Sequence, residues 1–201
     1  MDKKEQIQFV KNCFETLYAK CDAGHPSLLK GESKRLCGLS EEDGGVPAEM
    51  EADTPNEEGY VKWKLIPSTL TDKDIDGLEE KCGFAFPGLY RTFLTIYFHL
   101  FEELTGVWDQ ASDNPLVEEY DPFLASCNYL AFASDLDDYS IICIDVSQMP
   151  NEELCSVCKI DHDILYGFDE TSATRKDVEK EMLVMHKNLK AFLEDVFLGN
   201  K

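Results

Sequence analysis

The sequence lacks any apolar run long enough to cross a bilayer, which takes about 20 residues. The longest apolar run, residues 93–101, is short and is interrupted by Thr95 and His99. The first five residues carry both signs of charge and lead into no apolar stretch, so no signal peptide is predicted. We therefore expect a soluble, cytoplasmic protein without a membrane partner, whose hydrophobic fraction of 43% suffices for a folded core.

Basic residues are scarce, and one long segment has none. The chain has 40 acidic and 19 basic residues, a net charge of −21, and no lysine or arginine falls between Thr92 and Cys158. Such an excess repels nucleic-acid phosphates and anionic lipids and attracts basic proteins. General solubility is the alternative explanation, but confinement to one segment favours a partner surface. The thirteen acids of this base-free segment are Glu102, Glu103, Asp109, Asp113, Glu118, Glu119, Asp121, Asp135, Asp137, Asp138, Asp145, Glu152 and Glu153.

The sequence also lacks the complete ligand sets of common metal sites. Cys155 and Cys158 form a CxxC pair with His162 nearby, but no second CxxC supplies the remaining ligands of a structural zinc site. A thioredoxin-type role would need a βαβ pattern around the pair, which is absent. Without a secretion signal, we expect reduced thiols, several of them in the core. The eight cysteines are Cys13, Cys21, Cys37, Cys82, Cys127, Cys143, Cys155 and Cys158.

Two further polar clusters suggest chemistry only weakly. The acidic turn 134–138 is followed by Tyr139 and Ser140, where an EF-hand requires an oxygen ligand and a glycine. The Asp-His-Asp sequence at 161–163 could orient an imidazole for acid–base work. No nucleophile elbow and no phosphate-binding glycine loop accompany it. We predict no catalytic, metal-binding or cofactor-binding residue.

Apolar periodicity and turn residues predict an α+β fold, a mainly antiparallel sheet flanked by helices. An amphipathic helix over 5–21 and an acidic connector with many Gly and Pro residues, 22–58, form an N-terminal extension, residues 1–58. A single domain, residues 59–201, follows. It is predicted to begin with a strand at 60–65, with Trp63 in the core, and a helix capped by Thr71 and ended by Gly83. A second helix starts at Pro87 and is predicted to bury Tyr90, Phe93, Leu94, Tyr97 and Leu100. A hairpin of 128–133 and 139–146, a strand at 156–161 and a long helix at 174–196 capped by Thr174 and Asp177 complete the prediction.

Three runs of the predicted domain resemble the SUKH superfamily. The first, 63–94, has a short helix with Ile75 and Glu79, followed by a glycine, a proline, a tyrosine and an apolar helix. The second, 129–145, is similar to the family's central hairpin, in which an acidic turn precedes a strand ending in aspartate. The third, 188–196, is similar to its last helix. The resemblance covers residues 59–198 and lacks two family features, an Asn-Gly pair after the apolar helix and a glycine in the hairpin turn.

The resemblance implies a domain of bacterial immunity proteins that neutralise toxins, often nucleases, and of a fungal cell-wall regulator that acts as an interaction module. Neither role needs an active site, and the acidic charge independently suits a basic partner. We therefore predict a non-enzymatic module that binds a basic toxin through an acidic surface. The alternatives are an interaction scaffold or regulator without a toxin partner and, third, a metal- or thiol-dependent enzyme. The predicted partner-binding residues are Glu102, Glu103, Trp108, Asp109, Glu118, Glu119, Asp135, Asp137 and Asp138.

Overall fold

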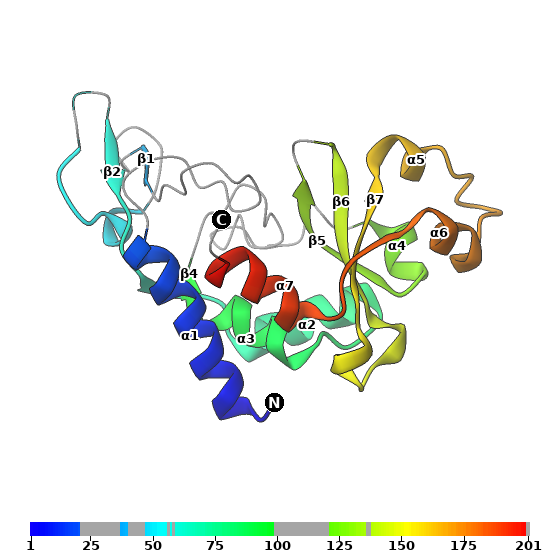
Figure 1. Cartoon of the computed structure of the whole chain (residues 1–201), viewed down its shortest axis with the longest axis horizontal. Helices are drawn as coiled ribbons and strands as arrows, with labels where there is room; N and C mark the ends of the chain where they lie inside the picture. The colour runs from blue at the N-terminus through cyan, green and yellow to red at the C-terminus, as the bar shows by residue number, and fades with distance from the viewer. Residues whose placement is uncertain are drawn as a thin grey trace.

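The computed structural model describes residues 1–20, 37–39, 47–55, 57, 59–98, 121–135 and 138–199. They form the predicted α+β fold, in which helices lie on both sides of an antiparallel sheet (Figure 1). No helix within these ranges is long and apolar enough to cross a membrane. In chain order the elements are α1 (Lys3–Lys20), β1 (Cys37–Leu39), η2 (Ala48–Met50), β2 (Tyr60–Lys62), β3 (Ile66–Pro67), α2 (Asp72–Cys82), α3 (Gly88–Ile96), β4 (Tyr97–Phe98), α4 (Pro122–Ser126), β5 (Tyr129–Asp135), β6 (Ser140–Asp145), η4 (Val146–Gln148), η5 (Glu152–Leu154), β7 (Val157–Asp161), α5 (His162–Tyr166), α6 (Arg175–Glu181), β8 (Leu183–His186), α7 (Leu189–Leu193) and η6 (Glu194–Leu198).

The main sheet has four antiparallel strands in the order β5-β6-β7-β8. It confirms the predicted hairpin, β5 with β6, and the predicted third strand, β7. At one end of the sheet Ser140 lies opposite both Asp135 on β5 and Asp161 on β7. The acidic turn and the start of α5 are therefore neighbours in space, although they are more than 20 residues apart in sequence (Figure 1).

The long helix predicted for 174–196 is wrong. α6 ends at Glu181, Met182 is extended, and β8 pairs with β7 before α7 begins. This pairing satisfies backbone groups that would otherwise lie open along one side of β7. Asn188 starts α7 as its N-cap, and its side-chain oxygen accepts from the Ala191 N–H at 3.0 Å. The apolar spacing of the segment does not distinguish one helix from two short helices joined by a strand.

The sheet separates two hydrophobic cores. On β6, Ile142 and Ile144 face the main core, which α1, α2, α3 and α7 cover, whereas Cys143 between them faces the second core. The second core is closed by residues of α4, α5 and α6, among them Phe123 and Leu165. This alternation is the period-2 geometry of a strand that is buried on both faces. Figure 1 shows the two groups of helices on opposite sides of the sheet.

The N-terminal helix α1 is part of the main core. Val10, Phe14 and Leu17 on one of its faces are buried. The ring of Phe14 lies 5.4 Å from the rings of both Phe93 on α3 and Phe197 in η6. α1 therefore packs between α3 and the C-terminal segment, and it shares the core of the domain predicted to begin at residue 59.

The predicted helix caps are confirmed. Thr71 starts α2 in a capping box with Asp74, and Gly83 ends it with a left-handed φ of 79°. Thr174 starts α6 with the same type of box. In each box the side chains satisfy N–H groups that have no partner within the helix. These caps fix where α2 and α6 begin.

Two predicted elements are shorter than expected. The strand predicted at 60–65 ends at Lys62 as β2, and the next residue, Trp63, is buried as predicted. The helix after Pro87 ends at Ile96 because Tyr97 is extended and β4 pairs with β3. Of its predicted buried residues, Tyr90, Phe93 and Leu94 are buried, Tyr97 is half-buried in β4, and Leu100 lies outside the described residues.

Candidate partner-binding surface

The β5–β6 turn brings two of the predicted partner-binding carboxylates to a single lysine. Lys159 on β7 reaches across β6, and its Nζ lies 3.2 Å from Asp135 Oδ2 and also contacts Asp138 Oδ2. Asp138 Oδ1 accepts from the Ser140 N–H at 3.1 Å, which fixes the turn. Asp135 and Lys159 are largely covered, whereas about half of the Asp138 side chain, 49%, remains exposed.

This lysine sets the protonation behaviour of the turn. Partial burial raises the pKa of Asp138, but hydrogen bonds from Lys159 and Ser140 outweigh it, so the pKa lies below its ordinary value. Burial lowers the pKa of Lys159, and the hydrogen bonds to Asp138 and Asp135 more than reverse that effect. Because the Asp138 pKa is depressed on folding, its contribution to stability is present above pH 3.8 and is lost as the pH falls through the depressed pKa.

The other described acids of the base-free segment also bind within the chain. Asp121 caps α4 by accepting from a backbone N–H at 2.7 Å. Glu152 accepts at 2.8 Å from the first N–H of α3, and Glu153 accepts from Asn188 Nδ2 at 2.9 Å. These carboxylates therefore help to hold the fold together, and because their hydrogen-bond partners here are neutral, they keep their negative charge.

Asp145, at the end of β6, forms a largely covered ion pair with Arg175. Its Oδ2 lies 2.7 Å from Arg175 Nη2, and the two side chains are 18% and 25% exposed. Arg175 also donates to the Cys127 carbonyl and to Glu179, and its guanidinium lies 4.5 Å from the centroid of the Tyr129 ring. The aspartate that ends the family-like hairpin thus anchors α6 to the sheet.

Two of the nine predicted partner-binding residues lie within the described part of the chain. Glu102, Glu103, Trp108, Asp109, Glu118, Glu119 and Asp137 lie outside the described residues. Asp135 and Asp138 are described, and the structure brings them together at the hairpin turn.

The CxxC cysteines lie on opposite sides of the sheet. Cys155 packs in the main core and Cys158 in the second core, and both are almost completely buried. Burial raises the pKa of Cys155 to about 11 and that of Cys158 to about 12. The sheet thus separates the two thiols, and burial disfavours the thiolate that a metal site or a thiol enzyme would need.

We expect both thiols to resist alkylation in the folded protein. At pH 8, pKa values of about 11 and 12 reduce the thiolate fraction at least a hundredfold relative to an ordinary cysteine. Iodoacetamide labelling followed by peptide mass spectrometry should show slow modification of Cys155 and Cys158 in the native protein. Labelling in denaturant provides the control for intrinsic reactivity. Equal rates in the native and denatured protein would contradict the buried, protonated state.

The Asp-His-Asp sequence at 161–163 is used to start α5. Asp161 Oδ1 accepts from the N–H groups of Asp163 and Ile164 at 2.8 and 3.1 Å. His162 Nδ1 lies 3.4 Å from Asp163 Oδ1, and the two side chains are 52% and 99% exposed. Across the described part of the chain, no group of three or more His, Cys, Asp and Glu side chains is placed to hold a metal ion.

A cavity of about 270 Å³ lies where the start of α1 meets α3, η5 and α7. Gln6, Glu152, Glu153 and Lys190 are among its polar lining residues. The two carboxylates already bind the start of α3 and Asn188. Because both carboxylates already form hydrogen bonds within the chain, we infer that the polar residues of this cavity hold the surrounding elements together.

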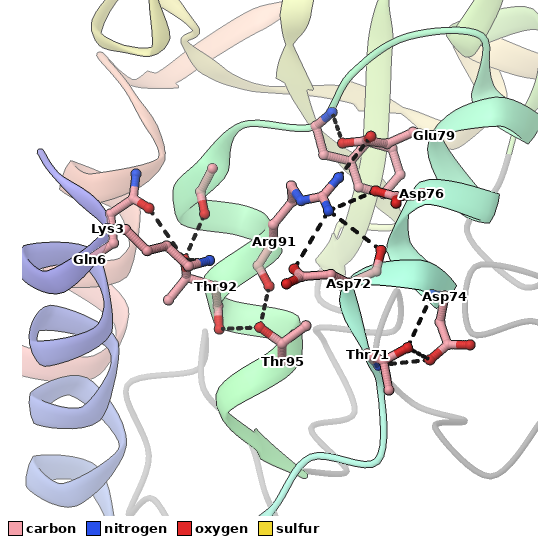
Figure 2. A network of polar contacts seen from close by, with 12 residues as sticks. Lys3, Gln6, Thr71, Asp72, Asp74, Asp76, Glu79, Arg91, Thr92 and Thr95 are labelled. Atoms are coloured by element: carbon pink, nitrogen blue, oxygen red, sulfur yellow. Dashed lines mark hydrogen bonds and ion pairs between the residues drawn. The ribbon is translucent and has the colours of Figure 1, made fainter.

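Helices α2 and α3 are joined by an ion-pair network centred on Arg91 (Figure 2). Arg91 Nη1 lies 2.8 Å from Glu79 Oε2, and Nη2 lies 2.8 Å from Asp76 Oδ1 and 3.5 Å from Asp72 Oδ1. The second oxygen of Glu79 accepts from the Phe86 N–H at 2.7 Å. The glutamate of the family-like short helix therefore fixes both α3 and the loop before it.

We expect Glu79→Ala to lower the free energy of unfolding by about 2–3 kcal/mol, because it removes charge-assisted hydrogen bonds from a largely covered group. The matched control is Asp76→Ala, which also loses a 2.8 Å contact to Arg91 but at a carboxylate that is 66% exposed. Its effect should stay below about 1 kcal/mol, as for other exposed ion pairs. Urea denaturation measures both; equal losses would show that burial of Glu79 does not matter.

The sequence was compared with models of known protein families. A model described as the SMI1 / KNR4 family (SUKH-1) matches residues 69–195, which is more than half of the chain and spans α2 through α7. The chain belongs to the SUKH-1 family. This confirms the resemblance drawn from the sequence. No curated protein matches the chain.

Within the SUKH-1 match, sequence reasoning overlooked the two bases that organise the acidic segment. Lys159 and Arg175 are the first two bases after the base-free segment, and their partners Asp135, Asp138 and Asp145 lie within it. The signal was present in part: Lys159 is the only base between Thr92 and Thr174. A lone cation on a strand next to an acidic hairpin is expected to bind its carboxylates. Nothing local in the sequence pairs Asp145 with Arg175, because the contact depends on how α6 packs on the sheet.

Proposed function

We infer that this SUKH-1 chain is a non-enzymatic, cytoplasmic protein-binding module of the immunity type, which neutralises a basic toxin. The carrying observation is the charge of the sheet region: residues 121–170 contain eleven acids and one base, Lys159. Pairing with Lys159 leaves a net negative charge at the hairpin turn, because it contacts two carboxylates with one ammonium group. Such a surface attracts a cationic partner over several ångströms of solvent.

A nuclease is the class of toxin that this charge suits best. An enzyme that grips nucleic acid presents cationic side chains to phosphate. A protein that presents carboxylates in their place can cover that surface and block substrate binding. Inhibition by coverage needs no active site, and burial of Cys155 and Cys158 supports a role without thiol chemistry.

The second candidate is an interaction scaffold or regulator without a toxin partner. It is favoured by one specific observation: the six described acids of the base-free segment all hydrogen-bond or form ion pairs within the chain. On this alternative, the acidity serves the fold and solubility, and the partner need not be basic.

Identification of the bound protein separates the two candidates. The tagged chain is purified from its native cell at low salt, and co-purifying proteins are identified by mass spectrometry. The immunity function predicts a basic protein that arrests growth when expressed alone and is neutralised when the chain is co-expressed. A neutral or acidic partner, or a basic one that does not affect growth, would favour the scaffold.

A further inference from the structure

The end of the sheet that holds the acidic turn also exposes two tyrosines. Tyr139, which follows the turn, is 75% exposed, and Tyr166, in α5, is 64% exposed. His162 begins α5 between them, and 52% of its side chain is exposed. We refer to Tyr139, His162 and Tyr166 as the aromatic tip. Large exposed aromatic groups of this kind are enriched where proteins bind other proteins.

The three residues lie at the same end of the sheet, and two contacts link them. The Tyr139 carbonyl accepts from the His162 N–H at 3.0 Å, which joins the hairpin turn to the first residue of α5. His162 and Tyr166 are four residues apart on the helix, and their ring centroids lie 4.5 Å apart in an edge-on arrangement. Strand pairing of Ser140 with Asp161 holds the residues that follow Tyr139 and precede His162 in register.

The stability of the fold does not explain why residue 139 is a tyrosine. Its backbone has a φ of 55°, a left-handed conformation that glycine and asparagine adopt more readily than a large aromatic residue. Its ring is exposed, so it gains little from burial in the core. The chain thus carries an aromatic side chain where the backbone favours another residue and where packing does not require one.

The charge around the aromatic tip indicates what it binds. Asp138, Asp161 and Asp163 lie next to it in the chain, and the side chain of Asp163 is 99% exposed. Lys159, the base on this end of β7, is already paired with Asp135 and Asp138. Carboxylates around aromatic rings attract arginine and lysine, which also stack on ring faces. They repel nucleic acid, anionic membranes and a second copy of a chain with a net charge of −21.

We propose that the aromatic tip is the anchor of the partner interface and receives arginine or lysine side chains of a basic protein. This inference rests on the proposed function and adds to it the residues that slow dissociation. The carboxylates speed encounter with the partner, and the tyrosines hold it once bound, because hot-spot contacts act mainly on the dissociation rate.

The test uses the basic protein that co-purifies with the wild-type chain as the probe. Tyr139→Asn and Tyr166→Ser are each expected to weaken binding about tenfold, and the double variant more, chiefly through faster dissociation. The salt dependence of association should not change, since no charge is removed. Tyr139→Asn should have a melting temperature equal to or above that of the wild type, because asparagine tolerates a left-handed φ.

Leu154→Ser is the matched control. Leu154 is 57% exposed and lies in η5, at the other end of β7 from Asp161, and its replacement should leave affinity within about twofold. Unchanged affinity in the double tyrosine variant would overturn the aromatic tip as an anchor while leaving the proposed function intact. If no basic protein binds the wild type, the aromatic tip as an anchor and the proposed function both fail. A wild-type dimer that the tyrosine variants dissociate would identify a second copy of this chain as the occupant and also overturn the proposal.

Discussion

Phe14→Ala is expected to lower the free energy of unfolding by about 3–5 kcal/mol, the usual loss for a fully buried phenylalanine. Phe14 has no exposed surface, and its ring contacts Phe93, Tyr97 and Phe197 at centroid distances of 5.4 Å. The substitution leaves a cavity between α1, α3 and the C-terminal segment, which rigid neighbouring rings fill poorly. Chemical denaturation followed by circular dichroism measures the change.

This prediction also tests where the folding unit begins. If residues 1–58 were an extension to an independent domain at 59–201, Phe14→Ala would change the stability of that domain by less than about 1 kcal/mol. Gln8→Ala is the control on the same helix, because Gln8 is exposed and its replacement tests helix propensity alone. A small effect for both variants would contradict the packing of α1 into the main core.

The second large effect concerns binding. Replacing Asp135 and Asp138 together with asparagine should reduce the association rate constant for the basic partner about tenfold at low salt. The double change removes two carboxylates and also leaves Lys159 unpaired, so the hairpin turn presents a cation to a cationic partner. Stopped-flow or surface plasmon resonance measurements of association report the effect directly.

Two variants show whether position or total charge matters. Asp72→Asn with Asp76→Asn removes the same charge from α2, where both carboxylates are mostly exposed, and should reduce association by less than about threefold. Lys159→Gln works in the opposite direction: it removes the ammonium charge that contacts Asp135 and Asp138, should speed association, and should slightly destabilise the fold. If the two double variants behaved alike, the hairpin turn would have no special part in the encounter.

Local sequence signals predicted the parts of the fold that local physics determines. The Thr71 capping box, the left-handed Gly83 and the β5–β6 hairpin each depend on a few neighbouring residues, and each was predictable. The strand β8 was not, because Leu183–His186 becomes extended only through pairing with β7, a partner more than 20 residues away. A four-residue strand between two helices is too short to show a recognisable alternation of apolar and polar residues.

The sign of the surface charge was predictable from the sequence, but the ion pairs within it were largely not. Composition alone indicated the negative charge, since the base-free segment has thirteen acids. A contact of Lys159 with Asp138 could be expected in part, because Lys159 is the only base beside the acidic hairpin, but nothing in the sequence pairs Arg175 with Asp145. The sequence also contained no sign that Tyr139 and Tyr166 lie at the same end of the sheet, because their placement depends on the register of β6 with β7.

Five of the acids that the structure describes around the sheet divide into two groups. Asp121, Asp145 and Glu152 cap helices or form well-covered contacts, and their loss would chiefly affect stability. Asp138 and Asp163 lie at the sheet end with substantial exposed surface, and their loss would chiefly affect encounter with a cationic protein. Variants from the two groups should differ in the quantity that they change.

The association rate constant of the wild-type chain and its co-purified partner, measured across ionic strength, tests whether the negative field recruits that partner. The Debye length shortens from about 30 Å at 0.01 M salt to about 3 Å at 1 M. Attraction between an acidic sheet end and a cationic protein predicts that the rate constant falls at least about tenfold over this range. An association rate constant that stays the same from low to high salt would contradict recruitment of the partner by the negative field.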